Sequence, residues 1–443
     1  MNQVATGFIP RPVWHSQRAY ILASVAGVVG LGNLWRFPYM AGENGGGTFV
    51  IAYAICILCL GIPLYVLEAS AGKLAQRGPV GLFRRVNPRW GPWFGWFLVV
   101  LTITIMSYYL VVSGWTLGYA VDAIMVNLKP FTEFTAGMAS LWFFLATTVL
   151  TFIVLLRGIS GLEQMSKILL PLLVLIVSGL AIYAQTLPGA SQARDFYFSF
   201  NLAKFLELRT WQMAAGQAFY SLAIGQGFLI TYGSYSPKGF NIVNSSTAVA
   251  FTNSIISVTA GLMVFPIVFT FGIAPDTGSQ LAFTAFPKIF GELLGGQFIG
   301  IAFYILLFVA AFTSCVGGMA VALAPIRDEF HMSRKRAALI VTAITAALGV
   351  PSALSFTSVG LTIGGKPFLD AIDQIAGSGV VVVAGIVGAA LIAWLLPKVQ
   401  ILSSINAPSR RLGPITFSPW WIISVGRYLP AAAVALLLLT YLV

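Results

Sequence analysis

The sequence is poor in charge, in cysteine and in histidine. Only 9% of its 443 residues are charged and 58% are hydrophobic, whereas about a quarter of the residues of an ordinary soluble domain are charged. This excludes a typical cytosolic enzyme. The 3 cysteines (Cys56, Cys59, Cys315) and 2 histidines (His15, His331) form no metal-ligand pattern, so we expect neither a disulfide nor a zinc site.

The sequence also lacks a nucleotide-binding loop and an acid–base cluster. Its glycine-rich run, 42–48, does not end in Gly-Lys-Ser/Thr, as a phosphate-binding loop does. The apolar runs contain no His/Asp/Glu cluster with catalytic spacing. We therefore expect no enzyme, and any transport would be driven by an ion gradient rather than by ATP.

Long apolar runs make up most of the chain. A membrane helix needs about 20 mainly apolar residues. Runs of about this length or longer lie at 19–42, 49–70, 92–125, 139–157, 166–185, 211–235, 243–274, 297–327, 336–353, 367–397 and 421–442. This pattern predicts an all-α integral membrane protein with eleven transmembrane helices.

The excess of basic residues fits membrane topology rather than nucleic-acid binding. The net charge is +12, and the bases lie in short clusters between the apolar runs. If the N-terminus is inside, the outer connections hold only Lys129, Arg194, Lys204, Arg209, Lys288 and Lys366, as the positive-inside rule requires. We expect a multi-pass protein of the plasma (inner) membrane with a cytoplasmic N-terminus, an extracellular or periplasmic C-terminus, and no nucleic-acid partner.

Two spans contain residues that interrupt a membrane helix. The first combines three glycines with polar residues (Gly27, Gly30, Gly32, Asn33, Arg36), and the sixth does the same (Gly216, Gln217, Ser221, Gly225, Gln226, Gly227). Spans one and six correspond in a fold of two inverted five-helix repeats, where paired breaks indicate a midplane binding site. The alternative, glycines that only allow close helix packing, does not account for the polar residues.

Other polar residues lie within the spans. Asn253 and Ser257 are in the seventh, Thr313 and Ser314 in the eighth, and Asp370 and Asp373 near the outer start of the tenth. Intramembrane ionisable groups are functional candidates, and we pair Arg36 with Asp373 as an outer gate. The competing interpretation is that these aspartates only mark a solvated helix end.

These residues supply the oxygen donors that a hard monovalent cation prefers. Side-chain oxygens of Asn33, Ser221, Asn253, Thr313 and Ser314, with carbonyls freed by a broken helix, would hold a cation whose site a substrate carboxylate completes. The same carboxylate would lie at the half-helix that begins near Leu31, where N–H groups point outward. Tyr109 is a candidate hydroxyl donor to it.

Several motifs resemble those of the neurotransmitter:sodium symporter family. The matches are residues 30–39 (GLGNLWRFPY) with 43–47 (ENGGG), 113–118 (SGWTLG), 157–159 (RGI), 230–235 (ITYGSY) and 328–329 (DE). The resemblance implies a leucine-transporter-like fold with helices 1 and 6 broken, and sodium-coupled import of an amino acid or amine by alternating access. It divides the chain into 1–18, a first repeat 19–185, an outer loop 186–210, a second repeat 211–397, an inner loop 398–420 and a last helix 421–443.

The resemblance also implies site residues. One sodium ion would be held by Val28, Asn33, Ser221 and Asn253, and a second by Ala26, Val29, Ala310, Thr313 and Ser314. The substrate would contact Val28, Gly30, Leu31, Gly32, Tyr109, Tyr220, Ser221, Ala223, Gln226, Ser314 and Gly318. Arg36 and Asp373 match an outer gate, and Arg11, Trp14, Tyr235 and Asp328 an inner one.

The pocket departs from close bacterial relatives. Gln226 replaces a usual Phe or Met, Ala223 a Ser or Gly, and Gly318 a larger residue, so we expect a roomier pocket with one more polar wall. Gly30 stands where monoamine carriers have Asp, which favours an amino acid over an amine.

A set of four donors resembles the chloride site of the family's chloride-dependent members: Tyr53, Gln217, Ser221 and Ser257. Chloride-independent bacterial members commonly have an acid at the position of Ser257. Without that carboxylate, a bound anion would lower the cost of burying sodium, so we expect chloride-stimulated transport. The alternative is a Ser257 that only hydrogen-bonds its own helix.

The sequence thus predicts a sodium-coupled amino acid symporter. A ligand sensor or a channel built on the same fold is the alternative. Substrate identity, ion stoichiometry and oligomeric state stay open.

Overall fold

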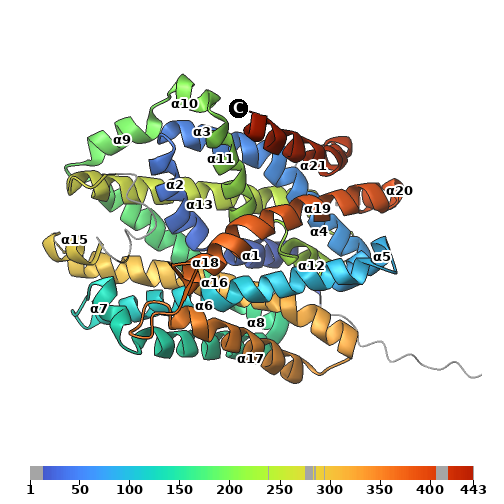
Figure 1. The fold of residues 1–443 in the computed structure, drawn as a ribbon, viewed down its shortest axis with the longest axis horizontal. Coiled ribbons are helices and arrows are strands. Elements are labelled where there is room, and N and C mark those ends of the chain that lie inside the picture. Colours follow the sequence, from blue (N-terminus) through green and yellow to red (C-terminus); the bar gives the residue numbers. More distant parts are fainter. Residues whose placement is uncertain are drawn as a thin grey trace, which may run out of the picture.

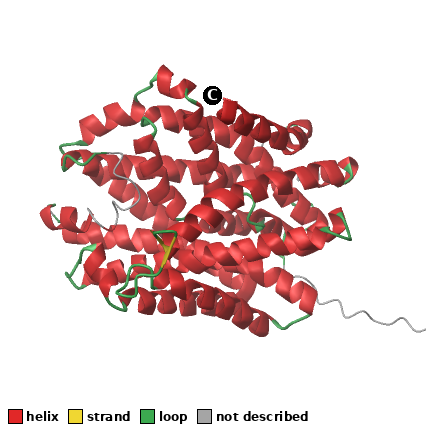
Figure 2. Cartoon of the chain, in the orientation of Figure 1, coloured by secondary structure: helices red, strands yellow, loops and turns green. Residues whose placement is uncertain are grey.

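A computed structural model describes residues 13–237, 239–274, 283, 286–293, 295–405 and 418–442. These residues are almost entirely helical (Figure 2). Their short strands, β1 (Thr362–Ile363) and β2 (Lys366–Pro367), form an antiparallel hairpin. The all-α prediction is confirmed.

The helices follow one another with short connections. The first half contains α1 (Gln17–Val28), the π-helical turn η1 (Gly32–Arg36), α2 (Phe37–Glu43), α3 (Gly47–Cys56), the π-turn η2 (Ile57–Gly61), α4 (Ile62–Ala75), α5 (Pro79–Val86), α6 (Gly91–Ile124), α7 (Phe131–Ala136) and α8 (Ala139–Ala184). The second contains α9 (Ala190–Phe198), α10 (Leu202–Leu206), α11 (Leu208–Ser221), α12 (Phe228–Ser234), α13 (Ile242–Thr270), α15 (Phe286–Glu292), α16 (Gly296–Phe330), α17 (Arg334–Ala353), α18 (Phe368–Ile372), the π-helix η3 (Asp373–Val380), α19 (Val381–Leu395), α20 (Lys398–Ile405) and α21 (Pro419–Leu442).

Every predicted apolar run coincides with helical structure. Within the described residues, 7 helices are long and apolar enough to cross a membrane, and α1 with η1 and α2 forms a further span bent by 57°. The fourth and fifth predicted spans are joined in α8, which has 46 residues and would be about twice as long as a membrane is thick if it were straight. It is interrupted at Gly158, whose φ is 63°.

Gly158 is required for a second reason. A Cβ atom there would overlap the guanidinium group of Arg334 at the start of α17. The left-handed backbone and the close approach both favour glycine. The interruption therefore lets two membrane spans follow each other with almost no connecting loop.

The bundle has two ends that carry different short helices. In Figure 1, α7, α9 and α15 lie toward one end of the long helices, and α5 and α20 lie at the other. The broken first span lies in the middle, where α1 packs against α8, α13 and α16. Its residues 23–35 are buried, so its interruption faces protein.

Helices α4 and α12 touch through their backbones. A Cβ at Gly72 would lie 2.0 Å from the carbonyl oxygen of Ile230, and one at Gly233 would lie 2.1 Å from that of Ala69. Glycines at these two positions let α12, the short second half of span six, pack against α4. Helix α12 is thereby held at a fixed place although it has only 7 residues.

We predict that Gly233→Ala destabilises the protein by about 1–3 kcal/mol, because the added methyl group forces the two backbones apart. Gly179→Ala in α8 is the matched control, since a Cβ there meets nothing within 4 Å. Thermal unfolding of the detergent-solubilised protein measures both. Equal melting temperatures for the two variants would contradict the packing described.

Candidate binding site between the broken helices

The break in the first span frees backbone N–H groups, and side chains bind them. Helix α1 ends at Val28, and Val29 is extended. The Gly30 N–H donates to Oδ1 of Asn33 at 3.1 Å, and the Leu31 N–H donates to the hydroxyl of Tyr109 at 2.9 Å. Because Tyr109 accepts here, its own proton can be donated to a ligand.

Gly30 leaves no room for a side chain. A Cβ atom would lie 2.5 Å from the Tyr109 hydroxyl and 2.7 Å from Oγ of Ser314. An aspartate, which monoamine carriers have at this position, would therefore not fit here.

The break in the sixth span extends over residues 222–227, between α11 and α12. Ala223, Gly225 and Gly227 have positive φ values of 53°, 82° and 71°. The Gly225 N–H donates to Oε1 of Glu68 at 3.1 Å, and the carbonyl of Gln226 accepts from Oγ1 of Thr102 at 2.6 Å. The predicted interruption of both spans is confirmed.

Sequence reasoning missed Glu68 and Thr102. Glu68 is only 2% exposed and is an acidic residue inside the apolar run 49–70. An acid at such a position is by default a functional candidate, so the signal was present. Thr102 gave no signal, because threonine in a membrane helix usually bonds its own backbone, as Thr102 also does with Leu98 at 2.8 Å.

The predicted first-sodium and chloride side chains form one buried network. Nδ2 of Asn33 donates to Oδ1 of Asn253 and to Oγ of Ser257, each at 2.8 Å. The hydroxyls of Tyr53 and Ser221 are hydrogen-bonded at 3.0 Å, and Ser257 and Asn253 also lie beside the Tyr53 hydroxyl. Ser257 in addition donates to the carbonyl of Asn253 at 3.1 Å, the bond within its own helix that the alternative interpretation expected.

Gln217, the fourth residue of the chloride hypothesis, is hydrogen-bonded to residues of the first break. Its Nε2 donates to the carbonyl of Gly32 at 2.8 Å, and its Oε1 accepts from Arg36 at 2.5 Å. It therefore joins α11 to η1. Its amide nitrogen thus binds the backbone of the first break, and among the described residues it makes no hydrogen bond to Tyr53.

The residues predicted for the second sodium lie where α16 crosses the first break. Oγ of Ser314 donates to the carbonyl of Val29 at 3.3 Å. Oγ1 of Thr313 donates to the carbonyl of Ala310 at 3.1 Å. Ala26, in the last turn of α1, is buried, and α1 packs against α16.

A cavity of about 50 Å³ lies between the two breaks. Of the predicted substrate residues, it is lined by Val28, Gly30, Gly32, Tyr109, Tyr220, Ser221, Ala223, Gln226, Ser314 and Gly318. Leu31 lies instead on the space above it. Ile105, Met106 and Phe228 also line the cavity and were not predicted, because nothing distinguishes them from core residues in sequence.

The space next to Gly318, where we expected extra room, is filled in this structure. A Cβ at Gly318 would lie 2.3 Å from Sδ of Met106. The Met106 side chain therefore occupies the space that the small residue at 318 leaves. The expected polar wall is present, because Gln226 lines the cavity.

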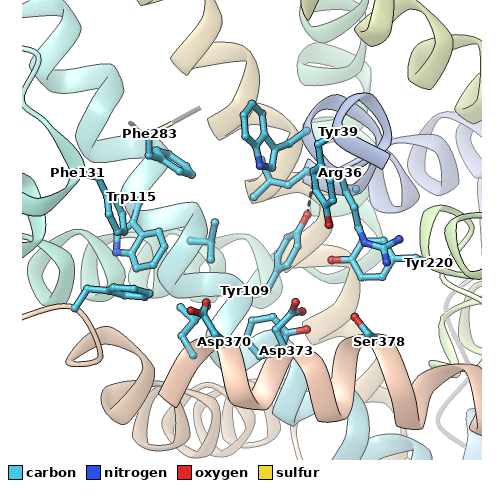
Figure 3. Close-up of a pocket in the computed structure, with 17 residues that line it drawn as sticks. Arg36, Tyr39, Tyr109, Trp115, Phe131, Tyr220, Phe283, Asp370, Asp373 and Ser378 are labelled. Atoms are coloured by element: carbon cyan, nitrogen blue, oxygen red, sulfur yellow. Dashed lines mark hydrogen bonds between the residues drawn. The ribbon is translucent and has the colours of Figure 1, made fainter. Parts of the chain in front are cut away.

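A larger vestibule of about 270 Å³ adjoins this cavity. Tyr109 and Tyr220 line both spaces, so their rings separate one from the other. Figure 3 shows Asp370, Asp373 and Ser378 on one side of the vestibule and Arg36 with Tyr220 opposite. Phe283 also lines it; residues 275–282 before it lie outside the described residues.

The predicted pair of Arg36 and Asp373 is not formed. In the part of the chain that the structure describes, these two side chains make no ion pair. The Arg36 guanidinium instead bonds Gln217, and it lies over the Tyr220 ring with 4.8 Å between its carbon and the ring centroid. These contacts hold the arginine on its own side, and the vestibule is open between the two charges.

The opposite side of the cavity is closed by the segment before α1. Trp14 is 2% exposed. Its indole N–H donates to the carbonyl of Tyr232 at 2.9 Å, and its backbone N–H donates to that of Tyr235 at 3.0 Å. His15 adds a 2.7 Å contact between Nδ1 and Oε2 of Glu163.

The other members of the predicted inner gate are placed in part. Asp328 lies near the end of α16, at the same end of the bundle as α5, with which α16 is in contact. Arg11 lies outside the described residues. The site as a whole is a central chamber that is open toward one end of the bundle and closed toward the other.

The fold and site define a helical membrane protein with a ligand chamber between two interrupted spans. The profile of the Sodium:neurotransmitter symporter family matches residues 11–135 and 128–442. The chain belongs to this family, whose members are non-enzymatic, multi-pass membrane transporters coupled to sodium.

Individual relatives are similar along most of their length. An uncharacterized sodium-dependent transporter of Haemophilus influenzae is 31% identical over 393 residues, 83% of this chain and 86% of the relative. The human sodium- and chloride-dependent GABA transporter 2 is 26% identical over 94% of this chain and 77% of its own. The crystal structure of MhsT in complex with L-phenylalanine matches with a TM-score of 0.87 and 34% identity, covering 97% of this chain and 99% of that one.

We predict that Trp14→Ala opens the closed side. Losing the buried indole removes contacts with three tyrosine rings and a hydrogen bond, and each 1.4 kcal/mol or so of lost closure energy raises the open population about tenfold. A Ser24→Cys reporter, placed at a buried position, should then react faster with a polar maleimide. The control is Trp93→Ala, which removes a tryptophan that is 77% exposed.

The reporter is read in a background without Cys56, Cys59 and Cys315. Unchanged labelling in Trp14→Ala, or equal acceleration in Trp93→Ala, would contradict the role of Trp14 as the closing residue.

Proposed function

We propose that this protein imports an amino acid together with sodium, by alternating access of the central cavity to the two sides of the membrane. The observation that carries the proposal is a cavity between two broken helices, surrounded by backbone groups and side-chain oxygens and lined by no charged side chain of the described residues. In such a site the carboxylate of a zwitterionic amino acid balances the charge of the cation, and the cation balances that of the carboxylate. The match to a transporter that binds L-phenylalanine supports an amino acid as substrate.

The donor set fits sodium at the first position. Asn33, Asn253 and Ser221 supply oxygens next to the broken end of α1, where Val28 supplies a carbonyl. Nδ2 of Asn253 is buried and has no hydrogen-bond partner among the described residues. Its Oδ1 accepts from Nδ2 of Asn33 at 2.8 Å, and sodium would take the place of this hydrogen bond on the Asn253 oxygen.

The second sodium would use the carbonyls of Ala26, Val29 and Ala310 with the hydroxyls of Thr313 and Ser314. The 3.3 Å contact between Ser314 and the Val29 carbonyl brings two of these five oxygens together. An ion here would join the broken first span to α16. Its release would let α1 separate from α16, which is the movement that opening of the closed side requires.

The substrate carboxylate would lie beside the first sodium and accept a hydrogen bond from the Tyr109 hydroxyl. Tyr220, which lies against Gly32, would cover the substrate from the vestibule. Arg36 and Asp373, on opposite sides of that vestibule, would approach each other when it closes.

We also propose the orientation. The end of the bundle with α5 and α20 carries Arg84, Arg85 and Lys398, and we assign it to the cytoplasm by the positive-inside rule. Trp14 then closes the cytoplasmic side, and residues 19–185 and 211–397 form two halves of opposite orientation in the plasma (inner) membrane.

Chloride would bind beside the first sodium, among Tyr53, Ser221 and Ser257. These hydroxyls are adjacent, and none of them is a carboxylate that could balance the sodium charge. Because Gln217 bonds the backbone of Gly32, it would contribute to this site only through its second amide proton. The name of the human relative, which includes chloride, supports the proposal.

A sensor or a channel on the same fold is the alternative. A channel has no need for a chamber closed on one side by Trp14 and covered on the other by Tyr220. We therefore favour the symporter.

We predict that the protein in liposomes accumulates an amino acid only when sodium is present outside. Tyr109→Phe should weaken apparent substrate affinity by roughly 10- to 100-fold, because a hydrogen bond to a charged group is lost. Tyr428→Phe, at a tyrosine that is 61% exposed, is the control. Binding without sodium-dependent accumulation would indicate a sensor, and flux that does not saturate would indicate a channel.

We further predict that uptake slows several-fold when gluconate replaces chloride, and that Ser257→Glu removes this dependence, because a carboxylate supplies the negative charge in place of the anion. Ser257→Ala is the control: it deletes the hydroxyl without adding charge and should not restore uptake in gluconate. Equal uptake in both anions by the wild-type protein and by Ser257→Glu would refute the chloride site.

A further inference from the structure

Gln226 differs from the other polar side chains that line the central cavity. It is 9% exposed and lines the cavity. Tyr109, Asn33, Ser221 and Ser314 each make a hydrogen bond to protein. Among the residues that the structure describes, the side-chain amide of Gln226 makes none.

The backbone fixes where this amide can reach. Gln226 stands between Gly225 and Gly227, both with positive φ. The N–H of Gly225 is bound by Glu68, and the carbonyl of Gln226 itself is bound by Thr102. These two hydrogen bonds to α4 and α6 fix the main chain at Gln226. The side chain of Gln226 therefore extends into the cavity from a fixed backbone.

The walls near Gln226 exclude charged ligand groups. Ile105, Met106 and Phe228 line the cavity with it, and no Asp, Glu, Lys or Arg is among the described residues that do so. A charged substrate side chain would lie there without a counter-charge, at a high cost in a low-dielectric site. An apolar side chain would leave the buried amide of Gln226 unpaired.

The cavity also limits size. It measures about 50 Å³, and one water molecule needs about 10–15 Å³ measured in this way. Met106, which fills the space beside Gly318, sets this limit. The space suits a side chain of few atoms.

From these observations we propose that the substrate is a small neutral amino acid with a hydrogen-bonding side chain, of the hydroxyl-bearing class of serine and threonine, and that Gln226 selects it by binding that side chain. This rests on the proposed sodium-coupled import of an amino acid.

The test uses pairs of amino acids with the same shape but different polarity: threonine with valine, and serine with 2-aminobutyrate. Each is measured by sodium-dependent thermal stabilisation of the purified protein and by competition with uptake into liposomes. The wild-type protein should prefer the hydroxyl member of each pair by roughly 10- to 100-fold, the range expected when a buried amide would otherwise stay unpaired.

Gln226→Met keeps a long side chain but removes its hydrogen-bonding groups, so the ratio within each pair should fall to about one or reverse. Ile105→Val is the matched control: it changes the size of the pocket, not its polarity, and should keep the preference for the hydroxyl member. A Gln226→Met protein that retains the full preference would overturn the role of Gln226.

The wild-type ratios alone decide the substrate class, whether or not the variants fold. If the protein takes up valine or 2-aminobutyrate with sodium as well as the hydroxyl members, this inference fails and the proposed transport stands. If no amino acid gives sodium-dependent stabilisation or uptake, both fail.

Discussion

The structure depends on one constraint: a polar backbone group inside a membrane must be bound by something. Breaking two helices in the middle of the protein exposes several such groups at one depth. Tyr109 binds the Leu31 N–H, Asn33 that of Gly30, and Glu68 that of Gly225. Tyr109 and Glu68 belong to other helices, α6 and α4, so their hydrogen bonds also fix the two breaks against neighbouring helices.

The overall fold could be predicted from the sequence because membrane helices are defined by length and apolar composition, and both are visible without a structure. The two breaks were also predictable, since glycines with Asn33 or Gln217 beside them suit neither lipid contact nor simple packing. The joining of two spans in α8 could not be predicted. It depends on the positive φ of Gly158 and on the close approach of Arg334 to this residue, and the sequence shows neither.

Within the site, residues whose chemistry is unusual for a membrane were found, with the exception of Glu68, and those whose role comes from geometry were not. Asn33 and Asn253 were identified by their amides in apolar spans, and they meet at 2.8 Å. The partners of Gln217 were not predictable, since an amide binds whichever donor or acceptor the fold brings to it. The contact of Met106 with Gly318 was not predictable for the same reason: a small residue at 318 does not tell which side chain lies against it.

The contact between Met106 and Gly318 has a consequence for how such a protein changes its substrate over evolution. A thioether chain has several rotatable bonds and no fixed shape, so a single rotamer change there alters the volume of the chamber. The residues that we propose for the carboxylate and the cations are other ones and are not affected. The size of the side chain that fits in the chamber can therefore change through one flexible residue.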